Sequence, residues 1–153
     1  MTKRTSNTQP TSQRTFSTIM PYLEPEQLTV LLIHVEAAHV AAHNLHNAIL
    51  SSAIEPATLT VLGLTTSYRI EVVQAKLEAQ GLTEEPIIDL LKLLRRYIDG
   101  VTRTLNGVQR APATSRQDPM LPHPEQLPEY ARDVMTKLAG IAEQVRLELE
   151  EWA

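Results

Sequence analysis

LTVLLIHVEAAHVAAHNLHNAILSS, from Leu28 to Ser52, is the stretch of sequence that decides the fold. Among its residues only Glu36 is an aspartate, glutamate, lysine or arginine, and the stretch also contains four of the chain's five histidines. Apolar side chains recur in it at intervals of three and four residues, which is the period of one face of an α-helix. This stripe consists of Leu28, Leu31, Val35, Ala38, Ala42, Leu45 and Ile49. We therefore predict a long helix with one fully apolar face.

The opposite face of this predicted helix is apolar as well. A helix that is apolar on all sides is buried on all sides, either inside its own bundle or against another chain. One bundle does not cover such a helix completely, so we expect the surplus face to contact a second copy or a protein partner. About 800 Å² per subunit is enough for a stable contact. The residues predicted to form this contact are Val30, Ile33, Ala37, Val40 and Ala41.

Composition narrows the class of protein. The 153 residues suit one domain with its own core, and 42% hydrophobic with 21% charged residues is typical of a globular chain. Aromatic residues make up only 4%, which favours packed helices over a sheet. Because the chain has no cysteine, disulfides, thiolate metal sites and cysteine nucleophiles are excluded. A net charge of −4 gives no reason to expect a general nucleic-acid binder.

Proline marks the start of the predicted helices, because its φ angle is already helical and its missing N–H costs nothing in the first turn. The helices are predicted at residues 25–53, 57–80, 86–106 and 128–152. Their similar lengths predict an all-α fold, an antiparallel four-helix bundle over residues 24–153. EPEQLTVL from Glu24 and EPATLTVL from Glu55 share six of eight residues. Both an internal duplication and a common helix-start pattern would explain this likeness.

Three of the five glycines have predicted structural roles. Gly81 and Gly107 follow the second and third apolar stripes and are predicted to end those helices. Gly63 lies inside the second helix, where glycine costs about 1 kcal/mol relative to alanine. We therefore expect a neighbouring helix to approach closely at this position.

Two segments outside the helices are polar or rich in proline. Residues 1–23 contain three basic residues and no acid, and they are predicted to form a basic tail that is disordered or ordered by a partner; a targeting segment is the alternative. The predicted loop at 108–126 holds a PxxP pattern at 119–122, which is typical of a spacer. Neither a secretory signal nor a membrane span is predicted, since the long apolar helix carries histidines and a glutamate near its middle. We expect a cytoplasmic protein.

The histidines of the first helix are the candidate metal ligands. Glu36 and His39 have the Glu-x-x-His spacing of ferritin-like di-iron proteins, and His43 and His46 continue the row at spacings that suit metal ligation. A di-iron site needs a second set of ligands, and no other predicted helix contains a histidine. At 100° per residue, these side chains also lie beside the core line of the helix. We predict structural histidines without bound metal, and a helix-bundle metal or redox protein is the alternative.

Basic residues on the third predicted helix are candidate phosphate contacts. They are Lys92, Arg95, Arg96 and Arg103. Asp89 and Asp99 interrupt this basic stripe, and no aromatic platform accompanies it, so a solvated face with ion pairs along the helix is the favoured interpretation. An accessory nucleic-acid-binding subunit that uses these cations and the basic tail is the second alternative.

The sequence shows no catalytic signature. No serine lies in a Gly-x-Ser-x-Gly turn, and the five glycines form no phosphate-binding loop. We therefore predict a non-enzymatic helical-bundle protein without a cofactor. It is expected to act by association, as a homo-oligomer or as a small subunit of a larger assembly.

Overall fold

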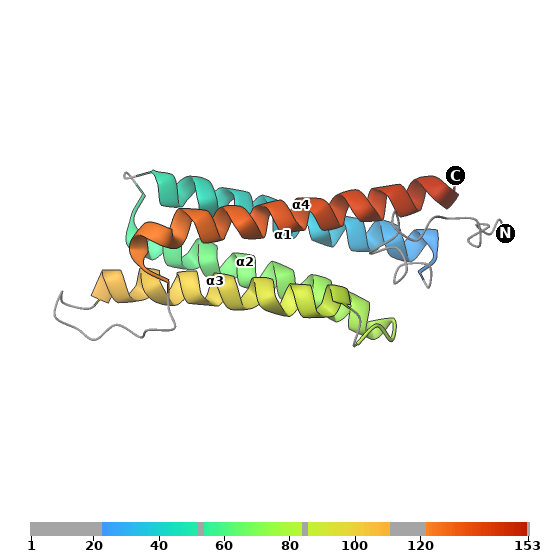
Figure 1. Cartoon of the computed structure of the whole chain (residues 1–153), viewed down its shortest axis with the longest axis horizontal. Coiled ribbons are helices and arrows are strands. Elements are labelled where there is room, and N and C mark those ends of the chain that lie inside the picture. Colours follow the sequence, from blue (N-terminus) through green and yellow to red (C-terminus); the bar gives the residue numbers. More distant parts are fainter. Residues whose placement is uncertain (1–22, 52–53, 84–85, 111–121, 153) are drawn as a thin grey trace.

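The computed structural model describes residues 23–51, 54–83, 86–110 and 122–152, which form four long helices and one short 3-10 turn (Figure 1). The elements are α1 (Pro25–Leu50), α2 (Pro56–Ala79), α3 (Pro86–Arg110), the turn η4 (Pro124–Gln126) and α4 (Leu127–Trp152). The predicted all-α four-helix bundle is confirmed. The basic tail as far as Tyr22 and most of the PxxP pattern lie outside the described residues.

Each helix runs antiparallel to the one before it along the chain (Figure 1). The most extensive contact joins α1 to α4, and α2 packs against both α1 and α3. The contact between α3 and α4 is the smallest of the four main helix pairs. Both α1 and α2 are therefore flanked by two helices each, and their outer sides have no helical neighbour among the described residues.

The core is built from the apolar stripes that the sequence displays. Six of the seven stripe residues of α1 are fully buried, and the seventh, Ile49, is half-buried. The apolar residues that recur in α3 at intervals of three and four are also all buried. These are Ile87, Leu91, Leu94, Ile98, Val101 and Leu105. The three-four spacing thus identifies the inner face of each of these helices.

The starts of α1 and η4 share the sequence Pro-Glu-Gln and the same hydrogen bond. At the start of α1 the backbone N–H of Glu24 donates to Oε1 of Gln27 over 2.8 Å. At the start of η4 the backbone N–H of His123 donates to Oε1 of Gln126 over the same distance. In both places a glutamine three residues after the cap accepts a backbone N–H that helix geometry leaves unpaired. Local hydrogen bonding therefore accounts for the Pro-Glu-Gln at the starts of α1 and η4. The start of α2, Pro-Ala-Thr, has no such cap, so this bond does not account for the likeness between the segments from Glu24 and Glu55.

Several boundaries differ from those that the sequence predicts, among them the end of the first helix, which lies at Leu50 and not at residue 53. The prediction that Gly107 ends the third helix is wrong, because α3 continues to Arg110. A single interior glycine weakens a helix by about 1 kcal/mol, which is too little to end one that is otherwise well supported.

Leu23, predicted as the last residue of the tail, is 2% exposed and belongs to the core. Leu23 lies directly before the helix cap Glu24, and Leu28 lies in the first turn after it. These are the two positions of a hydrophobic staple. The predicted loop at 108–126 is shortened at both ends, by α3 and by η4.

The expected close approach at Gly63 is confirmed. A Cβ atom at this position would lie 2.2 Å from Oγ1 and 3.2 Å from Cβ of Thr102 on α3. Oγ1 of Thr102 is itself buried and donates to the carbonyl oxygen of Ile98 over 2.8 Å. Glycine is therefore required here so that α2 and α3 can pack against each other.

Gly63→Ala is expected to lower the free energy of unfolding, although alanine is the better helix former by about 1 kcal/mol. Overpacking of a buried helix contact typically costs about 1–3 kcal/mol, and here the added methyl group meets the Thr102 side chain. Thr102→Ala in the same chain removes Oγ1 and should restore much of the loss. Urea denaturation of both single variants and the double variant measures this coupling, and purely additive effects would contradict it.

The first helix also has the dimensions of a membrane span. Among the described residues, α1 alone combines the length and the mean hydropathy, 1.2 over its most apolar window, of a helix that can cross a bilayer. A buried core helix meets the same criteria, and 39% of that window is buried within the bundle. Packing against α2 and α4 thus accounts for the inner face of α1 and leaves its apolar outer face to be explained.

Candidate functional site

The outer face of α1 is an exposed apolar strip. Ile33 is 59% exposed, Val40 is 54% exposed and Val30 is 43% exposed. Ala37 and Ala41 are half-buried beside them, at the edge that faces α2. All five residues predicted to form a protein contact therefore lie on one accessible side of the bundle.

A groove of about 470 Å³ runs between α1 and α2. Four of the five predicted contact residues line it, and α2 supplies the opposite wall. The α1 lining is Ile33, Glu36, Ala37, Val40, Ala41 and Asn44, and the α2 lining is Leu62, Thr65 and Arg69. The groove has a floor of small side chains and is mainly apolar, which suits a protein side chain better than a polar small molecule.

The second helix extends the apolar surface beyond the groove. Val61, Leu64 and Tyr68 are each nearly 60% exposed, and helical periodicity places Val61 and Tyr68 beside the groove residue Thr65. The sequence did not assign these side chains to a contact. The signal was present, because α2 carries a second apolar stripe that one bundle does not need. We refer to the exposed outer faces of α1 and α2, with the groove between them, as the α1–α2 face.

A smaller hollow of about 260 Å³ lies between the start of α1 and the end of α2. Val30 and Leu31 border it together with Leu77, and the side chains of Gln27 and Gln80 form a hydrogen bond of 2.5 Å beside it. The α1–α2 face is therefore accessible and partly hollowed along much of the length of α1.

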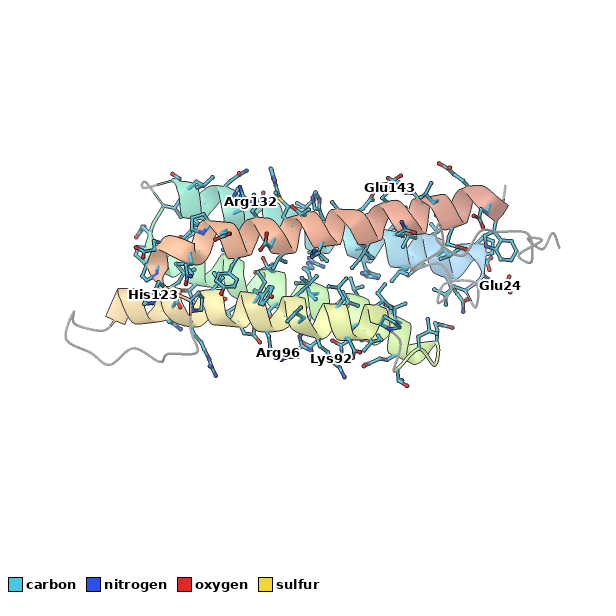
Figure 2. The ribbon with its side chains drawn as sticks, in the orientation of Figure 1. Glu24, Lys92, Arg96, His123, Arg132 and Glu143 are labelled. Carbon is cyan, nitrogen blue, oxygen red and sulfur yellow. The ribbon has the colours of Figure 1, made fainter. Side chains whose placement is uncertain are left out.

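The outer sides of α3 and α4 are different in character. Figure 2 shows Lys92 and Arg96 of α3 and Arg132 and Glu143 of α4 at the outer edges of the molecule. Of the nine large hydrophobic residues that the described part of the chain exposes, seven belong to α1 and α2, and α3 and α4 have one each. The two pairs of helices thus present one apolar and one charged side to the surroundings.

Glu36 is engaged in an ion pair with α4. Its Oε2 atom accepts from Nη2 of Arg146 over 2.5 Å, and Glu143 contributes a longer contact of 3.4 Å to the same guanidinium. The bond to Glu36 raises the pKa of Arg146 above its ordinary value. The carboxylate that the Glu-x-x-His spacing offered as a metal ligand is therefore used to join α1 to α4.

His39 and His43 line the same seam between α1 and α4. Their rings stack with centroids 6.4 Å apart. Nδ1 of His43 lies 3.2 Å from the Met135 sulfur on α4, and Nε2 lies 3.1 Å from the Asn47 amide nitrogen. Both ring nitrogens of His43 thus already have neighbours within the chain.

The structure does not gather the histidines and acids into a metal site. Among the described residues, no group of three or more histidine, aspartate and glutamate side chains is arranged to hold a metal ion. His46 is half-buried on α1. His123 is exposed at the start of η4, far along the chain from the histidines of α1. The spacing of Glu36, His39 and His43 serves contacts within the bundle.

The environment of His39 disfavours its charged form. Partial burial lowers its pKa below the ordinary 6.5, and the nearby His43 and Arg146 add to this, while Glu36 opposes it. Because the unfolded chain binds this proton more readily, the contribution of neutral His39 to stability is complete above pH 6.5 and decreases as the pH falls below that value. We expect acidification from pH 7.5 to 5.5 to destabilise the unmutated protein more than the His39→Gln variant. Urea denaturation at both pH values measures the difference, and equal losses would contradict it.

The basic residues of α3 do not form a continuous cationic surface. Lys92, Arg96 and Arg103 are exposed, whereas Arg95 is directed to α2, where Nη2 lies 3.8 Å from Glu71 and Nη1 lies 3.4 Å from Oε1 of Gln74. Acidic side chains also lie on the outer side of α3. Asp89 and Asp99 are exposed among these cations, and Asp99 accepts a hydrogen bond from Ser67.

Comparison with known proteins adds no functional assignment to this surface. No protein-family model, no curated protein and no solved structure matches the chain.

Proposed function

We propose that this chain is a non-enzymatic helical-bundle protein that acts by association, as a homo-oligomer or as a small subunit of a larger assembly. The observation that carries the proposal is the α1–α2 face, in which exposed valine, isoleucine, leucine and tyrosine side chains gather on two adjacent helices. Single exposed apolar residues are normal on a protein surface, but a contiguous patch with a groove is typical of an interaction site.

The other functional classes have less support from the described residues. Glu36 and His43, which a metal site would require, are bonded within the bundle. The α3 cations are mixed with acids, which weakens a phosphate-binding interpretation. The groove is mainly apolar, and of its polar lining residues Glu36 is already paired with Arg146 outside the groove. A cytoplasmic location belongs to the same proposal, and the packing of α1 against α2 and α4 supports a bundle helix over a membrane span.

The proposal is tested on the full-length protein in an extract of the cells that naturally make it. Size-exclusion chromatography with antibody detection should find the protein at an apparent mass well above the 17.1 kDa of one chain. Elution at the monomer mass in a freshly prepared, undiluted extract would contradict the proposal.

A further inference from the structure

We propose that the partner on the α1–α2 face is a second copy of this chain, bound about a two-fold axis. The inference rests on the proposed function and names its partner. In this arrangement each copy inserts the exposed ridge of its α1 helix into the groove between α1 and α2 of the other. Such an isologous contact uses the same surface twice, so both sides must carry a ridge and a groove.

The face contains both of these elements side by side. Ile33 and Val40 are seven residues apart, which places them two helical turns, or about 10.5 Å, from each other along α1. Ala37 and Ala41 form a low floor immediately beside this ridge. Because alanine side chains are short, a second helix can approach α1 closely enough for its valine and isoleucine side chains to enter the groove.

The exposed apolar patch supplies a large part of the surface that a stable dimer buries. Its six large apolar side chains are each 43–59% exposed, and together they form a patch comparable to the largest that monomers expose, roughly 300–600 Å². They are Val30, Ile33, Val40, Val61, Leu64 and Tyr68. With the alanines of the groove and its polar rim, each copy would bury roughly the 800 Å² that one partner contributes to a standard protein interface.

The charges of the face favour a second copy over a lipid surface or a polyanion. The groove is lined by one acid, Glu36, and one base, Arg69, and the other exposed charges of α1 and α2 include Glu26, Glu71 and Lys76. Helices that bind membrane surfaces carry bands of lysine and arginine beside their apolar face. Here the acids outnumber the bases, with Glu26, Glu36, Glu71 and Glu78 against Arg69 and Lys76, so neither helix carries a cationic band that would bind an anionic lipid surface or a polyanion.

Cross-linking tests this arrangement cleanly, because the chain has no native cysteine. Ala37→Cys places a thiol on the floor of the groove, beside the ridge formed by Ile33 and Val40, where the proposed arrangement brings the two copies together. Ala139→Cys is the matched control, an exposed alanine on α4, a helix that is not part of the α1–α2 face. Both full-length variants are purified, their masses are measured by light scattering, and a short bis-maleimide is added at low micromolar protein.

We expect a mass twice that of one 17.1 kDa chain and efficient cross-linking of Ala37→Cys, at least tenfold above Ala139→Cys. Adding Ile33→Asp to the Ala37→Cys chain should abolish the cross-link. A dimer that cross-links equally at both positions, or only at Ala139, would overturn the proposed arrangement and leave association as the function intact.

Two further outcomes separate the partner from the function. A purified protein that is monomeric up to about 100 µM would exclude the second copy, while a large complex in the native extract would retain the proposed function with a different partner. A monomer that instead floats with vesicles of phosphatidylcholine and phosphatidylglycerol, and is monomeric in the extract, would overturn both proposals and assign the face to lipid.

Discussion

Ile33→Asp combined with Val40→Asp is expected to convert the assembly that we propose into monomers of 17.1 kDa while leaving the helical circular dichroism unchanged. Both side chains are more than half exposed in the single chain, so the bundle tolerates a carboxylate at either position. In an assembly the same two side chains are removed from water. Burial of a valine or isoleucine contributes roughly 1.5–3 kcal/mol, and burial of an unpaired carboxylate is strongly unfavourable.

The expected loss of affinity follows from these values. Removing about 3–6 kcal/mol of association energy raises the dissociation constant by roughly 10²- to 10⁴-fold, since 1.4 kcal/mol corresponds to a factor of ten. Thr136→Asp combined with Ala139→Asp adds the same charge to exposed positions of α4 and should leave the mass unchanged. Light scattering over a dilution series measures both variants. An Ile33/Val40 double variant that keeps the native mass at low micromolar concentration would place the contact elsewhere.

Leu94→Ala is expected to lower the free energy of unfolding by about 2–5 kcal/mol, whereas Leu93→Ala should change it by less than about 1.5 kcal/mol. The two leucines are adjacent on α3, but Leu94 is 1% exposed and lies in the core, while Leu93 is 36% exposed. Truncation of the buried side chain loses its transfer energy and leaves a cavity that the surrounding helices fill only partly. The exposed side chain loses little, because much of it is already in contact with water.

The Leu94→Ala variant is measured against Leu93→Ala as its control. A domain of this size is stabilised by roughly 5–15 kcal/mol in total, so the Leu94 variant should be visibly less stable in urea at 25 °C. Unfolding followed by circular dichroism at two protein concentrations separates the loss within the bundle from any loss of association. Equal effects at the two positions would show that α3 does not pack with the face that the structure assigns to the core.

The helices and their inner faces were predictable because the information is local. Proline and glutamine at a helix start, and apolar side chains at intervals of three and four, act within a few residues of one another. The stripes of α1 and α3 are buried as their spacing predicts. The error at Gly107 has the same origin, since a local signal that weakens a helix was interpreted as one that ends it.

The α1–α2 face was predictable only in part. The apolar outer strip of α1 follows from its sequence, because no four-helix bundle covers a helix on every side. The contribution of Leu62, Thr65 and Arg69 does not, because it depends on which side of α2 turns toward α1. The second apolar stripe of α2, which includes Val61, Leu64 and Tyr68, is visible in the sequence but was not assigned to a contact.

The sequence by itself determined where the helices begin, which side of each is apolar, and that α1 carries more apolar surface than one bundle can bury. Only the tertiary structure decided how the flanks of these helices are used. Glu36 pairs with Arg146, 110 residues away, and Gly63 receives Thr102 from another helix. The physical reason is that helix periodicity is fixed by neighbours in the chain, whereas the rotation and spacing of packed helices are set by contacts between distant segments. Those contacts placed His39 and His43 between α1 and α4 and left the α1–α2 face exposed.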